Sequence, residues 1–502
     1  MVRFQENLPA WLLEISELLL RTCDEVYLVG GAIRNLLLGI EIDDYDFVVR
    51  KNAIGIARLV ADHLGGDFYI LDHTRKTARA IIPTGSILVK LDFALFNGED
   101  IMQDLIARDF TINAMALRFP IENQLIDPTG GAGDLKAKLL KPCSESAFID
   151  DPVRTIRFVR FLQELKLETE AAVEKRLKEA VPLLEKVSKE RQRDALLDVI
   201  NVSNLREAFN YMLAIGLIAQ LFPAAENLQD VELSLPHTYH AWDHTMQVMH
   251  YCQQLMALLG IAPPLVTFHP RVIDAFNRLD RYQEHLQNYF QKTISSGRTK
   301  YQLLVISAFF HDLAKGVVEY ELKGDRKKFP GHARRGAKII RDWAEVNHFS
   351  NKECAYLYNI VRMHMKVSRQ EMIDNATKNE NVFLFFKRAG EAGVMTALLH
   401  LADVLTTYED ALTDDRWDEA LTAVDNIFSA YFFNYDQIVN PVLLVNGHDL
   451  IQKFNLQPGR QIGDLLAALQ AEQAAGHIHN YQQALAFLSM RIANANEKKA
   501  GK

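Results

Sequence analysis

The chain has 502 residues, more than one compact core holds, and its length predicts about three domains. No run approaches the roughly 20 consecutive apolar residues of a membrane span, and the N-terminus has acidic and polar residues where a secretory signal has basic and then apolar ones. We therefore expect a cytoplasmic protein without a membrane partner. The formal net charge of -8 excludes a protein that coats nucleic acid over its whole surface, so any RNA should bind along a restricted basic surface. Four dispersed cysteines without a CxxC pair suggest neither disulfides nor a cysteine zinc site.

The hydrophobic period changes once along the chain. Five β-type runs (VYLVGG, DYDFVV, DFYILD, ARAIIP and SILVKLDFALF), separated by turn residues or a helical stretch, precede residue 145. From Asp151 onward the period is helical almost to the end. The predicted class is α+β, with a mixed-sheet head and an all-α remainder. The predicted domains are a head (1–145), a neck (146–225), a third domain (226–430) and a tail (431–502).

The segment VYLVGGAIRN, residues 26–35, has the pattern of a strand, a glycine turn and a helix start. Such a turn leaves backbone N–H groups free to meet a phosphate where no Cβ intrudes. Gly30 and Gly31 are therefore candidate phosphate-binding residues, with Arg34 one turn into the helix as a counter-charge. For this turn alone, a plain strand-to-helix connection is the alternative.

Two carboxylates follow on the next predicted strand. Asp44 and Asp46 are two residues apart, so both side chains should project from one face, where they repel each other unless a cation lies between them. Oxygen ligands suit Mg²⁺, which also binds substrate phosphates. Asp92 lies in a further apolar strand, where a lone charge is expensive unless it is exposed or serves a metal. These three residues are the candidate catalytic carboxylates of a two-metal site.

Five motifs in this half carry a family resemblance: GGAIRN, DYD, RDFTINAMAL, LIDPTGGAGDLKAKLL and DDPVRTIRFVRF. In this order they resemble the class II tRNA nucleotidyltransferase and bacterial poly(A) polymerase family, over about residues 20–210. The resemblance implies a small mixed-sheet head, a helical neck, Mg²⁺, nucleoside triphosphate donors and an RNA 3′ end as acceptor.

No segment matches the basic glycine–arginine stretch associated with the poly(A) polymerase branch, which favours tRNA as the acceptor. We expect addition of C and A (CCA) to the tRNA 3′ end from CTP and ATP, with release of pyrophosphate. CC addition, A addition and poly(A) synthesis remain alternatives. Oligomeric state is not indicated.

The resemblance also implies how the nucleotide is bound. Side chains of the neck pair with the base without a nucleic-acid template, and the matching residues are Asp151 and Arg154. At spacing i, i+3 the two should share one helix face, where Asp accepts from an exocyclic amine of C or A and Arg donates to ring acceptors. Further nucleotide contacts implied by the resemblance are Arg108, Asp109, Asn113, Arg157 and Arg160, with helix capping as the alternative for Asp109. The sequence departs from the family pattern at Asn35, Ala107 and Asp150.

The helical half contains a second group of motifs: HTYHAWDHT, FFHDLAKG, FPGHARRGA, RMHMK and LHLADVL. A histidine next to an aspartate in an apolar helix needs satisfied polar partners, and a bound metal explains it best. The set His244, His311, Asp312 and Asp403 resembles the HD-domain metal-dependent phosphohydrolases. His332 and His364 fall where members with two metals place further ligands.

Imidazole and carboxylate together suit Mn²⁺, Fe, Ni²⁺ or Co²⁺ better than Mg²⁺ alone. A hydrolase at this site would cleave phosphomonoesters or cyclic phosphodiesters, with Lys315 holding the phosphate, and a structural metal is the alternative. A different class of function therefore stays open: an HD phosphohydrolase with the head as its RNA-binding module. In the tail, NGHDL and PGRQIG are read either as helix termini or as a tRNA-contacting surface with Lys453 and Arg460.

Overall fold

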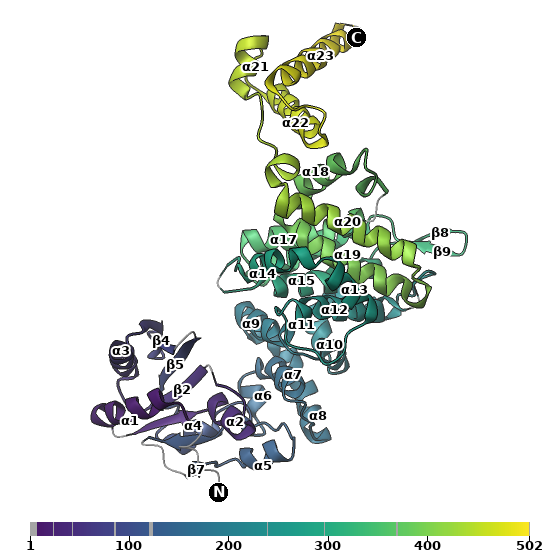
Figure 1. Ribbon diagram of the computed structural model, residues 1–502. Helices are drawn as coiled ribbons and strands as arrows, with labels where there is room; N and C mark the ends of the chain where they lie inside the picture. Colours follow the sequence, from purple (N-terminus) through teal and green to yellow (C-terminus); the bar gives the residue numbers. More distant parts are fainter. Residues whose placement is uncertain are drawn as a thin grey trace. The chain divides into compact units, whose positions relative to one another are not determined.

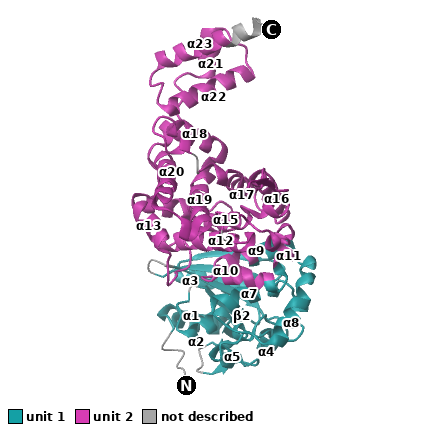
Figure 2. Cartoon of the chain, turned by 90° about the vertical axis from the view of Figure 1, so that its right-hand side faces the viewer, with its two compact units in different colours: residues 1–195, 214–217 teal, residues 196–213, 218–502 magenta. Residues whose placement is uncertain are grey.

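The computed structural model describes residues 8–23, 25–42, 44–84, 87–119, 124–237, 239–295, 297–367 and 370–500, without the side chains of residues 87 and 495–500. Contacts divide the chain into two units, coloured separately in Figure 2: residues 1–195 with 214–217, and residues 196–213 with 218–502. The first holds a mixed sheet and helices, and the second is almost wholly helical (Figure 1). The predicted α+β class is confirmed. No helix of the described ranges has the length and apolar character that crossing a membrane requires.

The sheet of the first unit has seven strands in the order β3-β4-β5-β2-β1-β6-β7. Neighbouring strands are antiparallel except for β2 and β5, which are parallel. All five predicted runs form strands, although Ser86 at the start of the fifth lies outside the described residues. The additional strands β6 and β7 are too short for alternation to be recognised. The bounds are β1 Val26–Val29, β2 Asp44–Val49, β3 Asp67–Asp72, β4 Thr77–Thr84, β5 Ile87–Leu95, β6 Ala116–Arg118 and β7 Leu125–Ile126.

Alternation along β2 decides which side chains enter the core. Tyr45 and Phe47 are buried, and the Phe47 ring stacks on Phe93 of β5 at 4.8 Å between ring centroids. They belong to the core cluster that helices α1 and α3 complete. Successive strand residues point to opposite faces, so Asp44 and Asp46 lie on the other face. The parallel register then sets Asp46 directly opposite Asp92.

Helices complete the first unit. Phe110, which follows α4, packs with three phenylalanines of the neck, Phe148, Phe158 and Phe161, at 5.6–6.4 Å between ring centroids. This shared aromatic core holds the neck helices against the RDFTINAMAL segment. The helices are α1 Ala10–Thr22, α2 Gly31–Leu38, α3 Ala53–Leu64, α4 Ile101–Ile106, the 3₁₀ turn η2 Thr111–Asn113, α5 Gly131–Lys136, α6 Ala147–Asp150, α7 Arg154–Glu164, α8 Ala171–Ala180 and α9 Lys189–Ile200, in which the unit boundary falls.

The second unit is built around α15, whose eleven residues are all buried. It packs against α12 and α17, and α19 packs against α12. Its helices are α10 Leu205–Ala214, α11 Leu217–Leu221, α12 Ala241–Leu258, α13 Pro270–Arg278, α14 Gln283–Gln291, α15 Lys300–Phe310, α16 His332–Val346, α17 Asn351–Met363, α18 Lys378–Ala389, α19 Gly393–Tyr408, α20 Asp414–Phe433, α21 Gly447–Phe454, α22 Arg460–Ala475 and α23 Tyr481–Ala500. One hairpin that the sequence does not predict interrupts them: β8 Glu321–Lys323 and β9 Arg326–Lys328.

Candidate active sites

The three predicted catalytic carboxylates converge. One oxygen each of Asp44, Asp46 and Asp92 lies within 4.8 Å of the others. Although part of the Asp46 residue is exposed, its carboxylate is desolvated, and this desolvation, followed by the charge of Asp44, raises the pKa of Asp46 to about 6. Such crowding of acidic oxygens disfavours ionisation unless a cation neutralises it. The donor set therefore fits a divalent metal.

Asp92 differs from its sequence interpretation, because it has a protein counter-charge. Arg79 on β4 lies directly opposite it and donates to both carboxylate oxygens, each at 2.7 Å. The apolar alternation around Asp92 predicts only exposure or a metal for this residue. The missed arginine is 13 positions away, and only the β4–β5 register reveals it. A bidentate ion pair holds the Asp92 carboxylate in one orientation beside Asp46.

The glycine turn forms the rim of this site. Gly30 has φ +73° and precedes α2, as the strand–turn–helix pattern predicts. A Cβ on Gly30 would lie 3.0 Å from Arg108 Nη1 and 3.3 Å from Asp46 Oδ2. The backbone thus approaches the carboxylates where only glycine fits. The Gly30 N–H donates to the Met115 carbonyl at 3.2 Å, so this group is already engaged.

Arg34 is buried behind the turn and held by two amide oxygens. Its Nη1 donates to Asn113 Oδ1 at 2.6 Å, and its Nε and Nη2 donate to Asn35 Oδ1 at 3.1 and 2.9 Å. Burial lowers the pKa of Arg34 from its ordinary value. Asn35 is one of the departures from the family pattern, and here it still supplies an acceptor for Arg34, without a negative charge.

Asp109 joins the 3₁₀ turn η2 to the neck helix α7. Its Oδ2 accepts from Arg157 Nε and Nη2 at 3.0 and 2.7 Å, and its Oδ1 accepts from Asn113 Nδ2 and the Phe110 N–H. Burial opposes ionisation, but Arg157 outweighs it and lowers the pKa of Asp109. The capping alternative is wrong, because the N-cap residue of η2 is Phe110 and not Asp109.

The geometry assumed for the base-recognition pair needs a correction. Asp151 is not on a helix face with Arg154: it is extended, at φ -144° and ψ 92°, and Arg154 is the first residue of α7. Pro152 explains this, because a residue before proline is disfavoured in the α region. A turn keeps the two residues close instead, since the Arg154 N–H donates to the Asp151 carbonyl at 3.0 Å.

Both side chains of the pair have protein partners. Arg191, from α9, donates to Asp151 Oδ2 at 2.7 Å, and Arg154 Nη2 donates to the carbonyl of Ala107, another family departure, at 2.8 Å. No sequence pattern marks Arg191 as this partner, because it is 40 positions from Asp151 in an ordinary charged helix. Arg160 ion-pairs with Glu164 at 2.9 Å, one turn farther along α7.

Arginines gather around one neck aromatic ring. The guanidinium carbons of Arg34, Arg157 and Arg160 lie 5.2, 5.6 and 5.2 Å from the Phe161 ring centroid. Arg108 is oriented separately by Asp104, which accepts from its Nε and Nη2 at 3.1 and 3.0 Å. Three of the arginines predicted to bind the nucleotide thus lie around one ring. Asp151 and Arg154 instead contact Arg191 and the Ala107 carbonyl.

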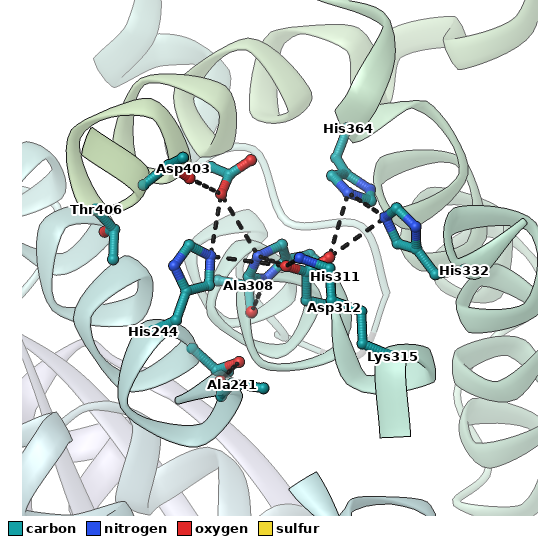
Figure 3. Close-up of polar contacts among 12 residues, drawn as sticks. Ala241, His244, Ala308, His311, Asp312, Lys315, His332, His364, Asp403 and Thr406 are labelled. Carbon is teal, nitrogen blue, oxygen red and sulfur yellow. Dashed lines mark hydrogen bonds and ion pairs between the residues drawn. The ribbon is translucent and has the colours of Figure 1, made fainter. Parts of the chain in front are cut away.

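The six predicted ligands of the HD site also converge, and Asp312 is shared between two clusters (Figure 3). Its Oδ2 lies 3.7 Å from His244 Nε2 and 3.4 Å from His311 Nε2. Its Oδ1 lies 3.4 Å from His332 Nε2 and 3.7 Å from His364 Nε2. Asp403 Oδ1 joins the first cluster, 3.1 Å from His244 Nε2 and 3.8 Å from His311 Nε2.

Backbone carbonyls orient three of these imidazoles. The Nδ1 atoms of His311, His332 and His364 lie 2.6, 2.7 and 2.8 Å from the carbonyls of residues three positions earlier in the chain. A proton on Nδ1 satisfies the carbonyl and leaves the Nε2 lone pair facing Asp312, as metal-binding histidines require. His311 Nε2 and Asp312 Oδ1 are buried without a hydrogen-bond partner among the described residues. The donor set therefore fits divalent metals.

Lys315 was predicted to hold a phosphate, and it contacts the centre itself. Its Nζ lies 2.5 Å from Asp312 Oδ2. Burial of Asp312 opposes ionisation, but Lys315 and then His311 keep its pKa well below the usual range. Burial lowers the pKa of His364 to about 4, so that its ring is neutral at physiological pH.

In the tail, the NGHDL segment is a helix start. Asn446 and Asp449 form a reciprocal capping box on α21, which confirms the helix-terminus interpretation there. Lys453 lies 5.5 Å from the Tyr481 ring centroid, and Arg460 is exposed at the first position of α22. Their contact with tRNA stays a prediction.

Profiles of known families match four stretches of the chain. The poly A polymerase head domain matches residues 26–141, the "Probable RNA and SrmB- binding site of polymerase A" residues 166–228, the HD domain residues 241–407 and tRNA nucleotidyltransferase domain 2 residues 420–488. The chain is 27% identical to a CC-adding tRNA nucleotidyltransferase of Synechocystis over 92% of both chains. The chain thus carries poly A polymerase head, HD and tRNA nucleotidyltransferase domains, and it is similar to tRNA nucleotidyltransferases along almost its whole length.

Other tRNA nucleotidyltransferases match over a similar share of the chain. An A-adding tRNA nucleotidyltransferase of Deinococcus radiodurans is 27% identical over 92% of this chain and 94% of that protein. The solved structure of a Thermotoga maritima CCA-adding enzyme complexed with tRNA covers 97% of both chains with a TM-score of 0.55 and 21% identity. At that identity the likeness shows the fold.

Proposed function

We propose that this protein adds C and A to the 3′ end of tRNA, using CTP and ATP and releasing pyrophosphate. The observation that carries the proposal is the convergence of Asp44, Asp46 and Asp92 beneath the Gly30 turn. The names of the relatives above, which are CC-adding, A-adding and CCA-adding enzymes, support tRNA as the acceptor. A tRNA substrate also agrees with the predicted cytoplasmic location.

In this reaction the 3′ oxygen of the RNA bonds to the α-phosphorus of the nucleotide, the bond from that phosphorus to pyrophosphate breaks, and the hydroxyl proton is released. Asp44 and Asp46 would hold divalent metal, Mg²⁺ by the preference of carboxylate oxygens, which supplies positive charge against the phosphates. Arg79 fixes the orientation of Asp92 beside them. The Gly30 turn, which lies against Asp46 and Arg108, would contact the triphosphate beside the carboxylates.

The neck residues would bind the rest of the nucleotide. Arg157, held by Asp109, and Arg34, held by Asn113, place two cations near Phe161 for the triphosphate. Asp151 would accept from the exocyclic amine that C and A share, and Arg154 would donate to ring acceptors. To bind the base, Asp151 would release Arg191, and Arg154 would release the Ala107 carbonyl, which are their partners in this structure.

The number of nucleotides added is tested with three tRNA transcripts, ending before CCA, after C and after CC. Each is incubated with Mg²⁺ and CTP, ATP or both, and product length is read on a gel. Our proposal predicts that both nucleotides together extend all three transcripts to CCA. A stop at CC assigns the CC-adding branch, extension of the third transcript alone the A-adding branch, and a long A ladder poly(A) synthesis. No extension of any transcript contradicts a nucleotidyltransferase.

We propose, as a second activity, that the HD centre hydrolyses phosphomonoesters or cyclic phosphodiesters, such as a damaged tRNA 3′ end. The shared Asp312 supports this activity, and so does the buried His311 Nε2, which has no hydrogen-bond partner among the described residues. Imidazole and carboxylate ligands together favour Mn²⁺, Fe, Ni²⁺ or Co²⁺. Hydrolysis joins a water oxygen to phosphorus and breaks the bond from phosphorus to the ribose oxygen, which takes a proton.

The second activity is measured with a tRNA ending in a cyclic phosphate and each of these metals in turn. Opening of the cyclic phosphate to a terminal phosphomonoester by the wild type, or its further hydrolysis to inorganic phosphate, and the loss of both in Asp312→Asn support a hydrolase. Metal binding without ring opening or phosphate release assigns the centre a structural role instead.

A further inference from the structure

A basic hairpin lies between two ligands of the HD centre. Strands β8 and β9 follow Asp312 and precede His332, and the hairpin projects from the helices of the second unit (Figure 1). Gly324, at φ +63°, forms the first position of its two-residue turn, where glycine is favoured. We call the hairpin and the first two turns of α16, residues 321–338, the basic arm.

The basic arm carries exposed positive charge that the protein leaves unneutralised. Among the described residues, none of six exposed cations of the arm forms an ion pair or a side-chain hydrogen bond, whereas Lys327 pairs with Glu232. The six are Lys323, Arg326, Lys328, Arg334, Arg335 and Lys338. In a chain of net charge -8, such a cluster has the character of the restricted basic surface that RNA binding requires.

The hairpin places like charges directly opposite each other. Lys323 and Arg326 are cross-strand partners, an arrangement that destabilises a hairpin. Glu321 lies opposite Lys328, but no ion pair joins them. Because a two-stranded hairpin is marginally stable by itself, a bound polyanion would relieve this repulsion where the protein does not.

The hairpin is nevertheless anchored, and its end contacts the HD centre. The Lys327 N–H donates to Ser234 Oγ at 2.8 Å, and Lys327 Nζ lies 3.2 Å from Glu232. The carbonyl of Phe329, directly after β9, lies 2.7 Å from His332 Nδ1. The Phe329 ring centroid is also 5.9 Å from Nζ of Lys315, which pairs with Asp312. The arm is thus a fixed surface beside the centre.

We propose that the basic arm binds the phosphate backbone of a single-stranded RNA segment beside the HD centre. Tyr320, which directly precedes the hairpin and is 52% exposed, offers a ring for base stacking. Cations beside an exposed aromatic ring are typical of single-strand binding, and the ring favours RNA over an acidic protein. The inference rests on the proposed RNA substrate and extends it to a second binding surface.

The test uses the full chain and a fluorescent single-stranded RNA of about 12 nucleotides, a length that spans one such surface. The arm variant is Lys323→Gln, Arg326→Gln and Lys328→Gln together. The matched control removes the same charge elsewhere in the second unit: Lys352→Gln, Lys387→Gln and Arg388→Gln. Fluorescence anisotropy gives the affinity between about 50 and 200 mM salt.

We expect the arm variant to bind at least about tenfold more weakly, with a slope of log affinity against log salt smaller by about 2, since each single-strand phosphate contact contributes about 0.7. The control should match the wild type. An oligonucleotide containing 4-thiouridine should cross-link to peptides of the arm. Equal affinity and slope in the arm variant, without such cross-links, overturns the inference. So does binding of polyglutamate by the arm in preference to RNA.

Nucleotide addition to a tRNA transcript, measured on the same preparations, separates this inference from the proposed function. If addition is absent while the arm binds RNA, the proposed function fails and the arm inference stands. If addition is normal while the arm variant binds RNA like the wild type, the arm inference alone fails.

Discussion

Replacing Gly30 by alanine tests the geometry of the head most sharply. Gly30 has φ +73° and ψ -135°, and its backbone lies close to the Asp46 carboxylate. Gly39, at the other end of the same helix, has φ +67° and nothing within 4 Å of an added Cβ. Gly39→Ala is therefore the matched control, because it carries a backbone cost without a collision.

The expected magnitudes differ between stability and activity. A non-glycine residue costs about 1–3 kcal/mol in the Gly30 conformation and about 1–2 kcal/mol at Gly39, so both variants should unfold a few degrees lower, at about 2–4 °C per kcal/mol. Only the Gly30 Cβ, 3.0 Å from Arg108 Nη1 and 3.3 Å from Asp46 Oδ2, displaces groups of the site. A displacement approaching 1 Å costs up to about 100-fold in rate.

The assay is kcat/KM for addition of CTP to a tRNA transcript ending before CCA, alongside thermal unfolding. We expect Gly30→Ala to lose about 10- to 100-fold relative to Gly39→Ala, with similar melting temperatures in the two variants. If the two variants agree within about threefold, which is under ~0.7 kcal/mol in barrier, the close approach of the Gly30 turn has no role in catalysis and our reasoning is wrong.

Three further variants test other parts of the structure. Arg191→Ala frees the Asp151 carboxylate and should change the preference for CTP and ATP over GTP and UTP without loss of metal affinity at the head, measured by competition assays. Glu353→Gln breaks a buried bidentate pair with Arg298 and should lower the free energy of unfolding of the second unit by about 3 kcal/mol, measured by urea denaturation at neutral pH. Burial opposes ionisation, but the bond from Arg298 lowers the pKa of Glu353, so this difference should persist above about pH 5 and shrink as the pH falls below about 4; a difference independent of pH would contradict the pair. Asp312→Asn should abolish metal binding at both HD clusters, whereas Asp403→Asn should weaken one, measured by metal titration; equal effects would contradict a shared ligand.

Local patterns predict the head well, because its determinants are short-range. The alternation around Asp44 and Asp46 places both on one face, and the glycine pattern of residues 26–35 gives the strand, turn and helix that the structure contains. In the helical half, His311 and Asp312 are recognisable because two polar residues follow an apolar run, and the structure places them directly after α15, which ends at Phe310.

Partners that depend on tertiary register are not predictable in this way. Arg79 meets Asp92 only because β4 and β5 pair in one register, and Arg191 reaches Asp151 from a helix whose position no local pattern fixes. The helical geometry assumed for Asp151 was wrong, since Pro152 imposes an extended residue before α7. The sequence did not predict the β8–β9 hairpin for a related reason. Its strands have three residues each, and most of these residues are charged, so no alternation of apolar and polar residues marks them as strands.

The central claim is that the carboxylates of the head, and not the HD centre, perform nucleotide addition. The most direct measurement is incorporation of labelled CTP and ATP into a tRNA transcript lacking CCA, by the wild type, by Asp44→Ala with Asp46→Ala, and by Asp312→Asn as the control. We predict full loss of addition in the head variant and wild-type addition in the HD variant. Addition that survives the loss of Asp44 and Asp46, or that disappears with Asp312→Asn alone, would contradict the account.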